Sequence, residues 1–455
     1  MKKTSQISVV DLGSSKITCV IATRGEEDNQ LRVVGVASVL SHGIRKSQIV
    51  DIEDTISSVT DAVESAERMA GFAVKEVAVS VSGIHIESQN SKGLVAVQDR
   101  GGEISHDDVV RVVEAAKAVP LATAREILHV IPRYFLVDNQ EGIKDPVGMS
   151  GVRLEAEAHL ITGSSVNLKN LSRVMSEIGV DTRAVVFAGL ASSLSTLTET
   201  EKELGAVVID IGGGTTSLCV YIDGALAHSA VVPVGAKNIT NDIAIGLRVS
   251  LDSAEKIKRN LAPDERIAKA LDPKNPGSKK QADEIDLSKL GLSDAPKKIS
   301  RKAVVEGIVR PRLNEIFELI KTELIKAGMG GKTPAGLIIT GGGSMTYGLT
   351  ESARKILNMQ SRIATPISLT GLVDEIKTPE YATVAGLLIM DDKADQATSK
   401  VPFRLPKFKG IISTSNFFKK VIDFIKSFLP WACRRACPNS RPAQANYVKM
   451  ITIWV

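Results

Sequence analysis

The sequence predicts an α/β protein made of two related halves, with a small α/β module inserted into the first half and an amphipathic helix near the C-terminus. Three observations lead to this fold class. An apolar, β-rich run that brings an aspartate into a turn of glycine and hydroxyl residues occurs at 9–16 (VVDLGSSK) and again at 207–216 (VVIDIGGGTT). Each copy begins a series of three β-type segments. Residues 416–429 (NFFKKVIDFIKSFL) place apolar side chains on one side of a helix and polar side chains on the other.

The composition is that of a globular protein that does not bind nucleic acid. The chain has 455 residues, of which 43% are hydrophobic and 24% charged, so it is long enough for two or more domains. A net charge of +5 and an aromatic content of 4% are too low for a nucleic-acid surface. The sequence contains no run of about 18 apolar residues and no secretory signal pattern, so we expect a cytoplasmic protein without a transmembrane helix.

The four cysteines give no sign of a disulfide framework or of a zinc site. Cys19 and Cys219 lie in apolar strand patterns and are expected to be small core residues. Cys433 and Cys437 lie in a basic segment near the C-terminus, where lipid attachment is one alternative.

The repeated turn has the features of a phosphate cradle. Glycines let the backbone approach a ligand closely, and successive N–H groups in such a turn form a nest for anions. Asp11 and Asp210 stand at the two strand ends, where a carboxylate can hold Mg²⁺ or its waters. The candidate phosphate ligands are Gly13, Ser14, Ser15 and Lys16 in the first turn and Gly212, Gly213, Gly214, Thr215 and Thr216 in the second. A plain tight hairpin is the alternative for each turn, and a chance repeat is the alternative for the pair.

A third motif, GLIITGGGS at 336–344, again ends a buried-type strand in glycines, and a helical pattern follows it at 346–359. A glycine turn before a helix N-terminus favours anions and the close approach of a ligand. The candidate ligand-binding residues of this turn are Gly341, Gly342, Gly343 and Ser344.

With these three motifs in this order, residues 1–429 resemble the actin, Hsp70 and sugar-kinase fold, which has two ribonuclease-H-like halves. Within that fold, the order and detail of the motifs are similar to the FtsA family of bacterial cell-division proteins. The resemblance implies one ATP with Mg²⁺ between the halves, with Asp11 and Asp210 anchoring Mg²⁺ through water and the third motif close to the adenosine. No water-positioning residue stands out, so we expect a nucleotide-dependent polymer with slow or no ATP hydrolysis rather than an enzyme.

The patterns and the resemblance together divide the chain into seven parts. These are subdomain 1A (1–82 and 160–195), the inserted subdomain 1C (83–159), subdomain 2A (196–226 and 303–390), subdomain 2B (227–302), a linker (391–414), the amphipathic helix (415–429) and an atypical tail (430–455). The expected strands of the two halves are 7–12, 17–23, 31–40 and 76–81 in the first and 206–211, 217–222 and 225–232 in the second. A helix is expected at 52–70, ended by Gly71.

The inserted module is expected to contain strands at 83–97, 126–137 and 152–159 and a helix at 105–119. Ser105 followed by Asp107 and Asp108 is a favourable helix start, with a hydroxyl cap and acids near the positive end. The resemblance implies that this module makes contacts along a polymer and with later division proteins.

Two helices carry small residues, one at 188–191 and one at 382–388. Small residues let helices cross closely, as a hinge between the halves would need, and ordinary helix packing is the alternative. A further helix is expected at 165–178.

The segment 235–260 offers further candidate ligands. Gly235, Asn238 and Asp242 follow the third strand of the second copy and are candidates to face a ligand. Asp252 and Ser253 can start the next helix, on which Glu255 and Lys258 share one face because they are three residues apart. The resemblance places these last two near the adenine and ribose; a surface ion pair is the alternative.

Subdomain 2B is expected to have loops with one or two short helices at 262–298, before a long helix at 299–327. The resemblance implies that this subdomain receives the C-terminal tail of FtsZ. The contact residues cannot be named from the sequence.

The segment 415–429 is predicted to lie on a membrane surface rather than on the protein core, because a polar linker precedes it and Pro430 stops it. The residues expected to contact an anionic membrane are Phe417, Phe418, Lys419, Lys420, Val421, Ile422, Phe424, Ile425, Lys426, Phe428 and Leu429. One such helix binds reversibly, and a polymer that carries many copies gains avidity. The tail after Pro430 departs from the family pattern, and a lineage-specific extension, a second membrane contact and an atypical gene end are the alternatives.

The predicted function is that of an ATP-binding, actin-like division protein that polymerises on the cytoplasmic face of the inner membrane at the division site. It would anchor the FtsZ ring there through its terminal helix. Three other functions are possible on the same fold. A sugar or acetate kinase would need a catalytic acid in a second pocket, a chaperone would need a β domain after residue 390, and a pilus-assembly homologue would lack the terminal helix.

Overall fold

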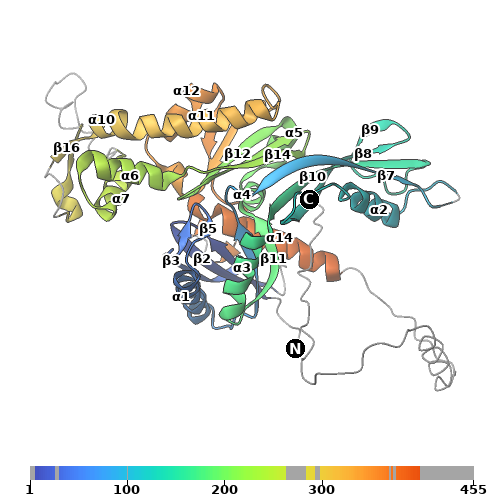
Figure 1. Ribbon diagram of the computed structural model, residues 1–455, viewed down its shortest axis with the longest axis horizontal. Helices are drawn as coiled ribbons and strands as arrows, with labels where there is room; N and C mark the ends of the chain where they lie inside the picture. The colour runs from blue at the N-terminus through green and yellow to red at the C-terminus, as the bar shows by residue number, and fades with distance from the viewer. Residues whose placement is uncertain are drawn as a thin grey trace, which may run out of the picture. The chain divides into compact units, whose positions relative to one another are not determined.

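Figure 1 shows the computed structural model of the chain, which describes residues 6–25, 30–99, 101–262, 283–292, 298–367, 370–371 and 376–399. The chain divides into two compact units. The first comprises residues 1–394 and 449–455, and the second residues 395–448. The elements described below belong to the first unit, except for the end of the last helix, which passes residue 394. The predicted membrane helix (415–429) and the atypical tail (430–455) lie outside the described residues. Within the described part of the chain, no helix is long and apolar enough to cross a membrane.

The first half is built on a six-stranded sheet in the order β11-β6-β1-β2-β3-β19. Its strands are β1 (Gln6–Leu12), β2 (Lys16–Arg24), β3 (Leu31–Leu40), β6 (Glu76–Val81), β11 (Asp181–Phe187) and β19 (Thr370–Gly371). Its helices are α1 (Ile52–Ala70) and α3 (Ser165–Glu177). The helix α4 (Ala188–Thr196) follows β11 and contacts strands of both the first and the second sheet. The four strands predicted for this half are confirmed. The helix α1 is confirmed as well and ends at Gly71, whose φ is 74°.

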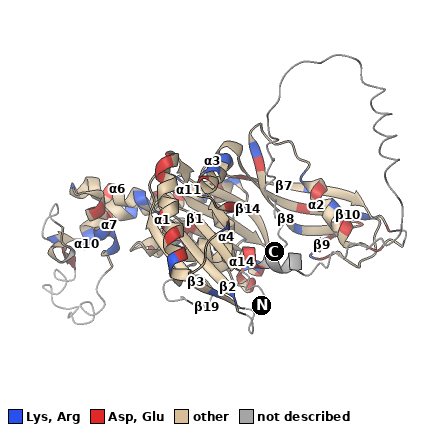
Figure 2. Cartoon of the chain, turned by 90° about the horizontal axis from the view of Figure 1, so that it is seen from below, with Lys and Arg blue, Asp and Glu red and all other residues tan. Residues whose placement is uncertain are grey.

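The second half repeats the hairpin of the first in a five-stranded sheet of order β14-β13-β12-β17-β18. Its strands are β12 (Ala206–Ile211), β13 (Thr216–Ile222), β14 (Ala225–Val232), β17 (Leu337–Thr340) and β18 (Ser361–Ile363). In the paired hairpins, Asp11 lies opposite Thr18 and Asp210 lies opposite Ser217. The two predicted copies are therefore the same hairpin at the level of structure. Charged side chains lie mainly on the helices, and the central strands are mostly uncharged (Figure 2).

The remaining elements of the second half are mainly helical. They are α5 (Glu199–Leu204), α6 (Ala236–Leu247), α7 (Leu251–Arg259), β15 (Glu284–Asp286), η1 (Leu287–Leu290), β16 (Lys298–Ser300), α10 (Arg301–Val304), the π-helical turn η2 (Val305–Val309), α11 (Arg310–Lys326), η3 (Gly342–Met345) and α12 (Leu349–Leu357). The helix predicted at 299–327 is confirmed, with a π-helical turn inside it. The predicted start of α7 at Asp252 or Ser253 is wrong, because Ser250 caps the helix by accepting from Ser253 N at 3.2 Å.

Two elements assigned from the sequence to the second half lie on the first sheet instead. β19 pairs with β3 in parallel. The helix α14 (Ala382–Ser399), which follows η4 (Pro379–Tyr381), is tied to the first sheet by ion pairs of Asp391 with Arg183 in β11 and of Asp392 with Arg24 in β2. An apolar pattern does not reveal which of two sheets a helix will cover. The sequence therefore could not show that β19 and α14 pack on the sheet of the first half.

The helices α4 and α14 cross at a point where there is no room for a side chain. A Cβ added at Gly386 would overlap the carbonyl oxygen of Ala191. Ser195 Oγ on α4 also donates to the carbonyl of Ala382, at 2.7 Å. The small residues therefore serve close helix packing, and a hinge at this crossing remains a prediction.

The inserted module has a core of its own, formed between the helix α2 (His106–Ala116) and a sheet of order β7-β10-β8-β9. The strands are β7 (Glu87–Ala96), β8 (Arg125–Val137), β9 (Gln140–Ile143) and β10 (Arg153–Ser164). The predicted cap of α2 is confirmed: Ser105 and Asp108 form a reciprocal capping box. The strand predicted at 152–159 is confirmed but continues as far as Ser164.

Buried histidines join the module to both halves. His129 Nε2 accepts a hydrogen bond from the backbone N–H of Phe187 in β11, at 2.9 Å. Because this nitrogen is an acceptor it carries no proton, and His129 is neutral. His159 Nδ1 lies 2.6 Å from Asn90 Oδ1 within the module, and its Nε2 lies 2.8 Å from Ser229 Oγ in β14. Burial lowers the pKa of His129 to about 4 and the pKa of His159 to about 3.

We expect these two histidines to destabilise the fold as the pH falls from about 6.5 towards 4. In that window the unfolded chain binds a proton on each histidine and the folded chain does not, because its pKa values are about 4 and about 3. Each histidine then removes up to about 1.4 kcal/mol of unfolding free energy per pH unit. Urea unfolding of the parent and of His159→Gln at several pH values measures the slope, with exposed His106→Asn as control. An equal acid slope in the parent and in His159→Gln would contradict the expectation.

Candidate functional site

The two aspartate-bearing turns meet each other across the boundary between the halves. We call this contact between the first turn (11–16) and the second turn (210–216) the turn junction. A Cβ added at Gly213 would overlap Ser15 Oγ, and one added at Gly214 would lie 2.7 Å from Ser14 Oγ. Only glycine allows the second turn to approach the first this closely. A ligand between the turns would therefore have to move them apart.

The two aspartates that end the strands are both poorly solvated. Ser80 Oγ donates to Asp11 Oδ1 at 2.5 Å, and Thr383 Oγ1 donates to Asp210 Oδ2 at 3.1 Å. Burial raises the pKa of Asp11. Burial, and next the negative charge of Asp11, raises the pKa of Asp210 to about 6. The two carboxylates are thus close enough to repel each other.

This pair of carboxylates suits a hydrated divalent cation. A cation between Asp11 and Asp210 would offset both the repulsion and the loss of solvation. Among the described residues, no group of three or more His, Cys, Asp or Glu could hold a metal. Two carboxylates are a ligand set that Mg²⁺ could take from a protein, since it keeps several waters and can take its other ligands from phosphate oxygens.

The third glycine turn packs against the start of the second turn. Gly341 has a φ of 83°, and a Cβ there would overlap Asp210 Oδ1; a Cβ at Gly343 would overlap the side chain of Ile211. Ser344 is fully buried, and its hydroxyl donates to the carbonyl of Gly341 at 2.7 Å. Ser344 therefore stabilises the turn, while Gly342 is exposed.

The start of α6 is bonded to the second turn. The backbone N–H groups of Ala236 and Lys237 donate to the carbonyls of Gly212 and Gly213 at 2.9 and 2.8 Å. A Cβ at Gly235 would lie 2.6 Å from the carbonyl oxygen of Gly212, so this glycine is required for the contact.

The other predicted residues around α6 have partners within the protein. Asn238 Oδ1 accepts from the N–H of Gly235 at 3.1 Å and so caps α6. Thr216 Oγ1 donates to the carbonyl of Val234 at 2.8 Å. Asp242, predicted as a candidate to face a ligand, instead binds Arg312 on α11 through two hydrogen bonds of 2.6 and 2.9 Å.

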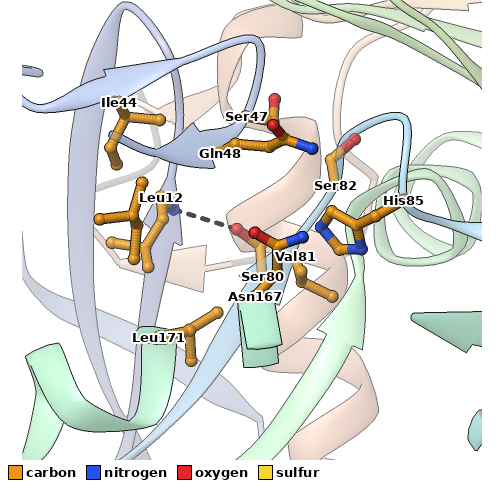
Figure 3. Close-up of a pocket in the computed structure, with 11 residues that line it drawn as sticks. Leu12, Ile44, Ser47, Gln48, Ser80, Val81, Ser82, His85, Asn167 and Leu171 are labelled. Carbon is orange, nitrogen blue, oxygen red and sulfur yellow. Dashed lines mark hydrogen bonds between the residues drawn. The ribbon is translucent and has the colours of Figure 1, made fainter. Parts of the chain in front are cut away.

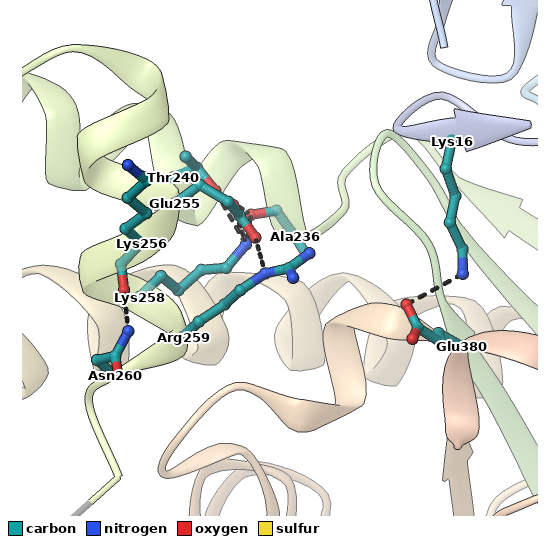
Figure 4. A network of polar contacts seen from close by, with 9 residues as sticks. All are labelled: Lys16, Ala236, Thr240, Glu255, Lys256, Lys258, Arg259, Asn260 and Glu380. Atoms are coloured by element: carbon teal, nitrogen blue, oxygen red, sulfur yellow. Dashed lines mark hydrogen bonds and ion pairs between the residues drawn. The ribbon is translucent and has the colours of Figure 1, made fainter. Parts of the chain in front are cut away.

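Glu255 and Lys258 form the predicted pair on one face of α7, with Nζ and Oε2 2.7 Å apart (Figure 4). Thr240 on α6 donates to the same oxygen at 2.6 Å and accepts from Lys258 at 2.9 Å. Burial works against ionisation of Glu255, but the charge of Lys258 lowers the pKa of Glu255 overall. With only 10% of its side chain exposed, Lys258 belongs to a half-buried network that joins α7 to α6 and not to a surface ion pair.

Three residues at the turn junction were not identified from the sequence: Glu380 and Tyr381, which contact the predicted Lys16, and Lys237. Lys16 Nζ lies 3.0 Å from Glu380 Oε2 (Figure 4). The same nitrogen lies 4.0 Å from the centre of the Tyr381 ring. Lys237 Nζ donates to the carbonyl of Ser14 at 2.7 Å, from the second half to the first. The only signal in the sequence was the position of these residues next to recognised motifs, Lys237 after Gly235 and Glu380 just before the small-residue helix.

A small cavity lies behind the first turn, between the end of β6 and the hairpin of β4 (Ile44–Arg45) and β5 (Gln48–Ile49) (Figure 3). Its polar lining comes from Ser47, Gln48, Ser80, Ser82, His85 and Asn167. Ser80 also accepts from the backbone N–H of Leu12 at 3.0 Å, so the cavity wall supports the first turn.

The two hairpin halves, joined at facing aspartate turns and followed by a third glycine turn, define a protein of the actin-like class. Comparison with solved structures agrees with this. The chain is similar to the PilM–PilN type IV pilus biogenesis complex, with a TM-score of 0.56 and 14% identity over 85% of this chain and 98% of that one. It is also similar to MreB5 of Spiroplasma citri bound to ADP, with a TM-score of 0.50 and 14% identity over 87% of this chain and 99% of that one.

The particular family follows from the sequence comparisons. The family model "Cell division protein FtsA" matches residues 207–386, and the model "SHS2 domain inserted in FTSA" matches residues 83–162. The cell division protein FtsA of Pseudomonas aeruginosa is 39% identical over 382 residues, which cover 84% of this chain and 88% of that protein. The chain therefore belongs to the FtsA family of cell-division proteins, and the resemblance drawn from its three motifs is confirmed.

Proposed function

We propose that this chain binds ATP with Mg²⁺ at the turn junction and uses it as a switch for assembly. The observation that carries the proposal is the close contact between the two aspartate-bearing turns, where Gly213 and Gly214 lie against Ser15 and Ser14. Gly13, Ser14, Ser15 and Lys16, with 212–216, would contact the phosphates, and Gly341 to Gly343 the adenosine. Support comes from the MreB5 structure, a protein of the same fold bound to ADP.

The base and the ribose would lie towards α6 and α7. Gly235 and Asn238 hold the start of α6 against the second turn, and Glu255 and Lys258 tie α7 to α6. Mg²⁺ would neutralise phosphate charge between the two carboxylates. We expect slow or no hydrolysis, because Glu380, a further carboxylate at the turn junction, is paired with Lys16 and is therefore not free to act as a general base.

We further propose that the chain assembles into filaments on the cytoplasmic face of the inner membrane at the division site. Its subdomain 2B would bind the C-terminal tail of FtsZ and its inserted module later division proteins. Exposed apolar side chains suit both roles: Ile245 and Leu251 at the corner of α6 and α7, and Val152 and Leu94 on the module.

Attachment to the membrane is assigned to residues 415–429. The eight apolar side chains of this segment would contribute about 1 kcal/mol each on partial burial, and each lysine near an anionic leaflet about 1 kcal/mol more. The cost of ordering the chain offsets much of this, so filament assembly and membrane binding would reinforce each other.

We expect the full chain to sediment with anionic vesicles, more so with MgATP, and residues 1–414 to stay in solution. Phe424→Glu should abolish sedimentation, because it places a charge on the apolar face of the predicted helix. Ser427→Glu is the matched control, since it adds the same charge to the polar face and should cost only a few-fold. Equal sedimentation of the full chain and of residues 1–414 would refute the assignment of the membrane helix.

A further inference from the structure

The short hairpin of β4 and β5 has an unusual tip. Its two central residues, Lys46 and Ser47, have φ values of 47° and 57°. A two-residue hairpin turn of this type needs positive φ at both positions and is normally built from Asn-Gly or Gly-Gly. Side chains at both positions are disfavoured, and such disfavoured backbone is concentrated at ligand sites. The tip therefore has a conformation that its residue types do not prefer.

The tip touches both turns of the turn junction. The backbone N–H of Ser47 donates to Ser14 Oγ in the first turn at 2.7 Å. Ser47 Oγ lies 2.8 Å from Thr215 Oγ1 in the second turn. A Cβ added at Gly214 would lie 3.0 Å from the backbone of Lys46. Two of the hydroxyls predicted to contact phosphate are thus already bonded to this hairpin.

The surroundings of the tip are basic. Arg45 and Lys46 are both exposed on the hairpin. Lys237 reaches the first turn at the same place. Burial lowers the pKa of Lys237, the charge of Glu255 opposes this, and the charges of Arg45 and Lys258 lower the pKa further. Cations held together in this way are stabilised by an anion. The first and second turns beside the tip have the features of a phosphate cradle, so a phosphate group is the anion expected here.

The position of the tip along the second turn indicates which phosphate it would meet. The third glycine turn contacts the second turn at its start, residues 210–211, whereas the tip contacts its end, residues 214–215. A nucleotide whose adenosine lies at the third turn and whose phosphates follow the second turn would bring its last phosphate to the tip.

We propose that the Lys46–Ser47 tip is a third phosphate-contacting element that binds the terminal phosphate of ATP and so distinguishes ATP from ADP. This inference rests on the proposed binding of ATP at the turn junction. The Lys46 ammonium and the Ser47 hydroxyl supply the donors, and the N–H of Ser47, which donates to Ser14 Oγ, leaves the Ser14 hydroxyl proton free to point at the phosphate. Hydrogen bonds to a charged phosphate are among the stronger ones, which accounts for retaining two unfavourable turn residues.

The test replaces the tip by the residues that the turn prefers. In the double variant Lys46→Asn, Ser47→Gly, we expect a higher melting temperature, because the turn is relieved. ATP affinity, measured by titration calorimetry with Mg²⁺ present, should fall by about 10-fold or more, with ADP affinity changed by about 2-fold or less. Lys46→Met, which removes only the charge, should show part of the same loss.

Asn139→Gly is the matched control, because Asp138 and Asn139 form the same kind of turn between β8 and β9, with φ values of 46° and 76°. It should raise the melting temperature without changing affinity for either nucleotide. An unchanged ratio of ATP to ADP affinity in the double variant would overturn the role of the tip and leave ATP binding at the turn junction standing. Failure of the parent chain to bind ATP would overturn both.

Discussion

Replacing Asp210 by asparagine is expected to abolish tight binding of MgATP and, at the same time, to stabilise the protein in the absence of nucleotide. The pKa of Asp210 is raised to about 6 by burial and by Asp11. Keeping this group ionised at pH 7 therefore costs on the order of 3 kcal/mol of folding free energy. Asparagine has a similar shape, keeps an acceptor for Thr383 and carries no charge. The substitution Asp210→Asn therefore removes the folding free energy that ionisation costs, and it also removes the carboxylate that would bind Mg²⁺.

The sign of the pH dependence follows from the raised pKa. The folded protein binds a proton on Asp210 between about pH 4 and 6, where the unfolded chain does not, so this group lowers stability as the pH rises through that window. The buried histidines act in the opposite direction. We therefore expect the Asp210→Asn variant to lose stability in acid more steeply than the parent.

Calorimetric titration with MgATP and urea unfolding at pH 5 and pH 7.5 measure the two effects. Asp242→Asn is the matched control: it is an aspartate of the same half that binds Arg312 outside the turn junction. It should weaken the fold by about 1–3 kcal/mol and leave ATP affinity unchanged. If Asp210→Asn bound MgATP as tightly as the parent, the proposed site would be wrong.

The sequence was sufficient to predict the elements whose cause is local. Alternation of apolar residues predicted the strands of both hairpins, and Ser105 with Asp108 predicted the start of α2, because cap and strand patterns act over a few residues. The two halves were recognised as related because the repeated turns need the same residue types. Cys19 and Cys219 are free and buried, as predicted from their apolar strands.

The parts that depend on distant contacts could not be predicted. Lys16 and Glu380 are 364 residues apart in sequence, and nothing local to Glu380 shows that it will meet the first turn. The same holds for Lys237, whose partner is a backbone carbonyl of the other half. The turn at the β4–β5 tip was also not recognised, because Lys46 and Ser47 are not the Asn-Gly or Gly-Gly residues that normally build this hairpin turn.

The crossing of α4 and α14 carries the second large expected effect. We expect Gly386→Ala to destabilise the protein by more than about 3 kcal/mol, and Gly386→Val to prevent folding. Even one methyl group at this position would overlap the carbonyl oxygen of Ala191. A backbone atom cannot rotate away, so the two helices would have to separate. That would also pull Thr383, at the start of α14, away from Asp210.

A matched control is Gly307→Ala in η2, where an added Cβ meets nothing within 4 Å. Because alanine favours helical backbone over glycine by about 1 kcal/mol, this change should leave the protein equally or slightly more stable. Thermal unfolding of the three variants separates two effects. The Gly386 variants test the steric overlap at the helix crossing, and Gly307→Ala tests the effect of replacing a helical glycine without an overlap. A Gly386→Ala protein that melts within about 1 °C of the parent would mean that the helices cross less closely than this, because a loss of about 3 kcal/mol corresponds to about 3–4 °C in a chain of this size. Since α14 lies on the first sheet and its first turn binds the aspartate of the second, this crossing joins the two halves directly beside the turn junction.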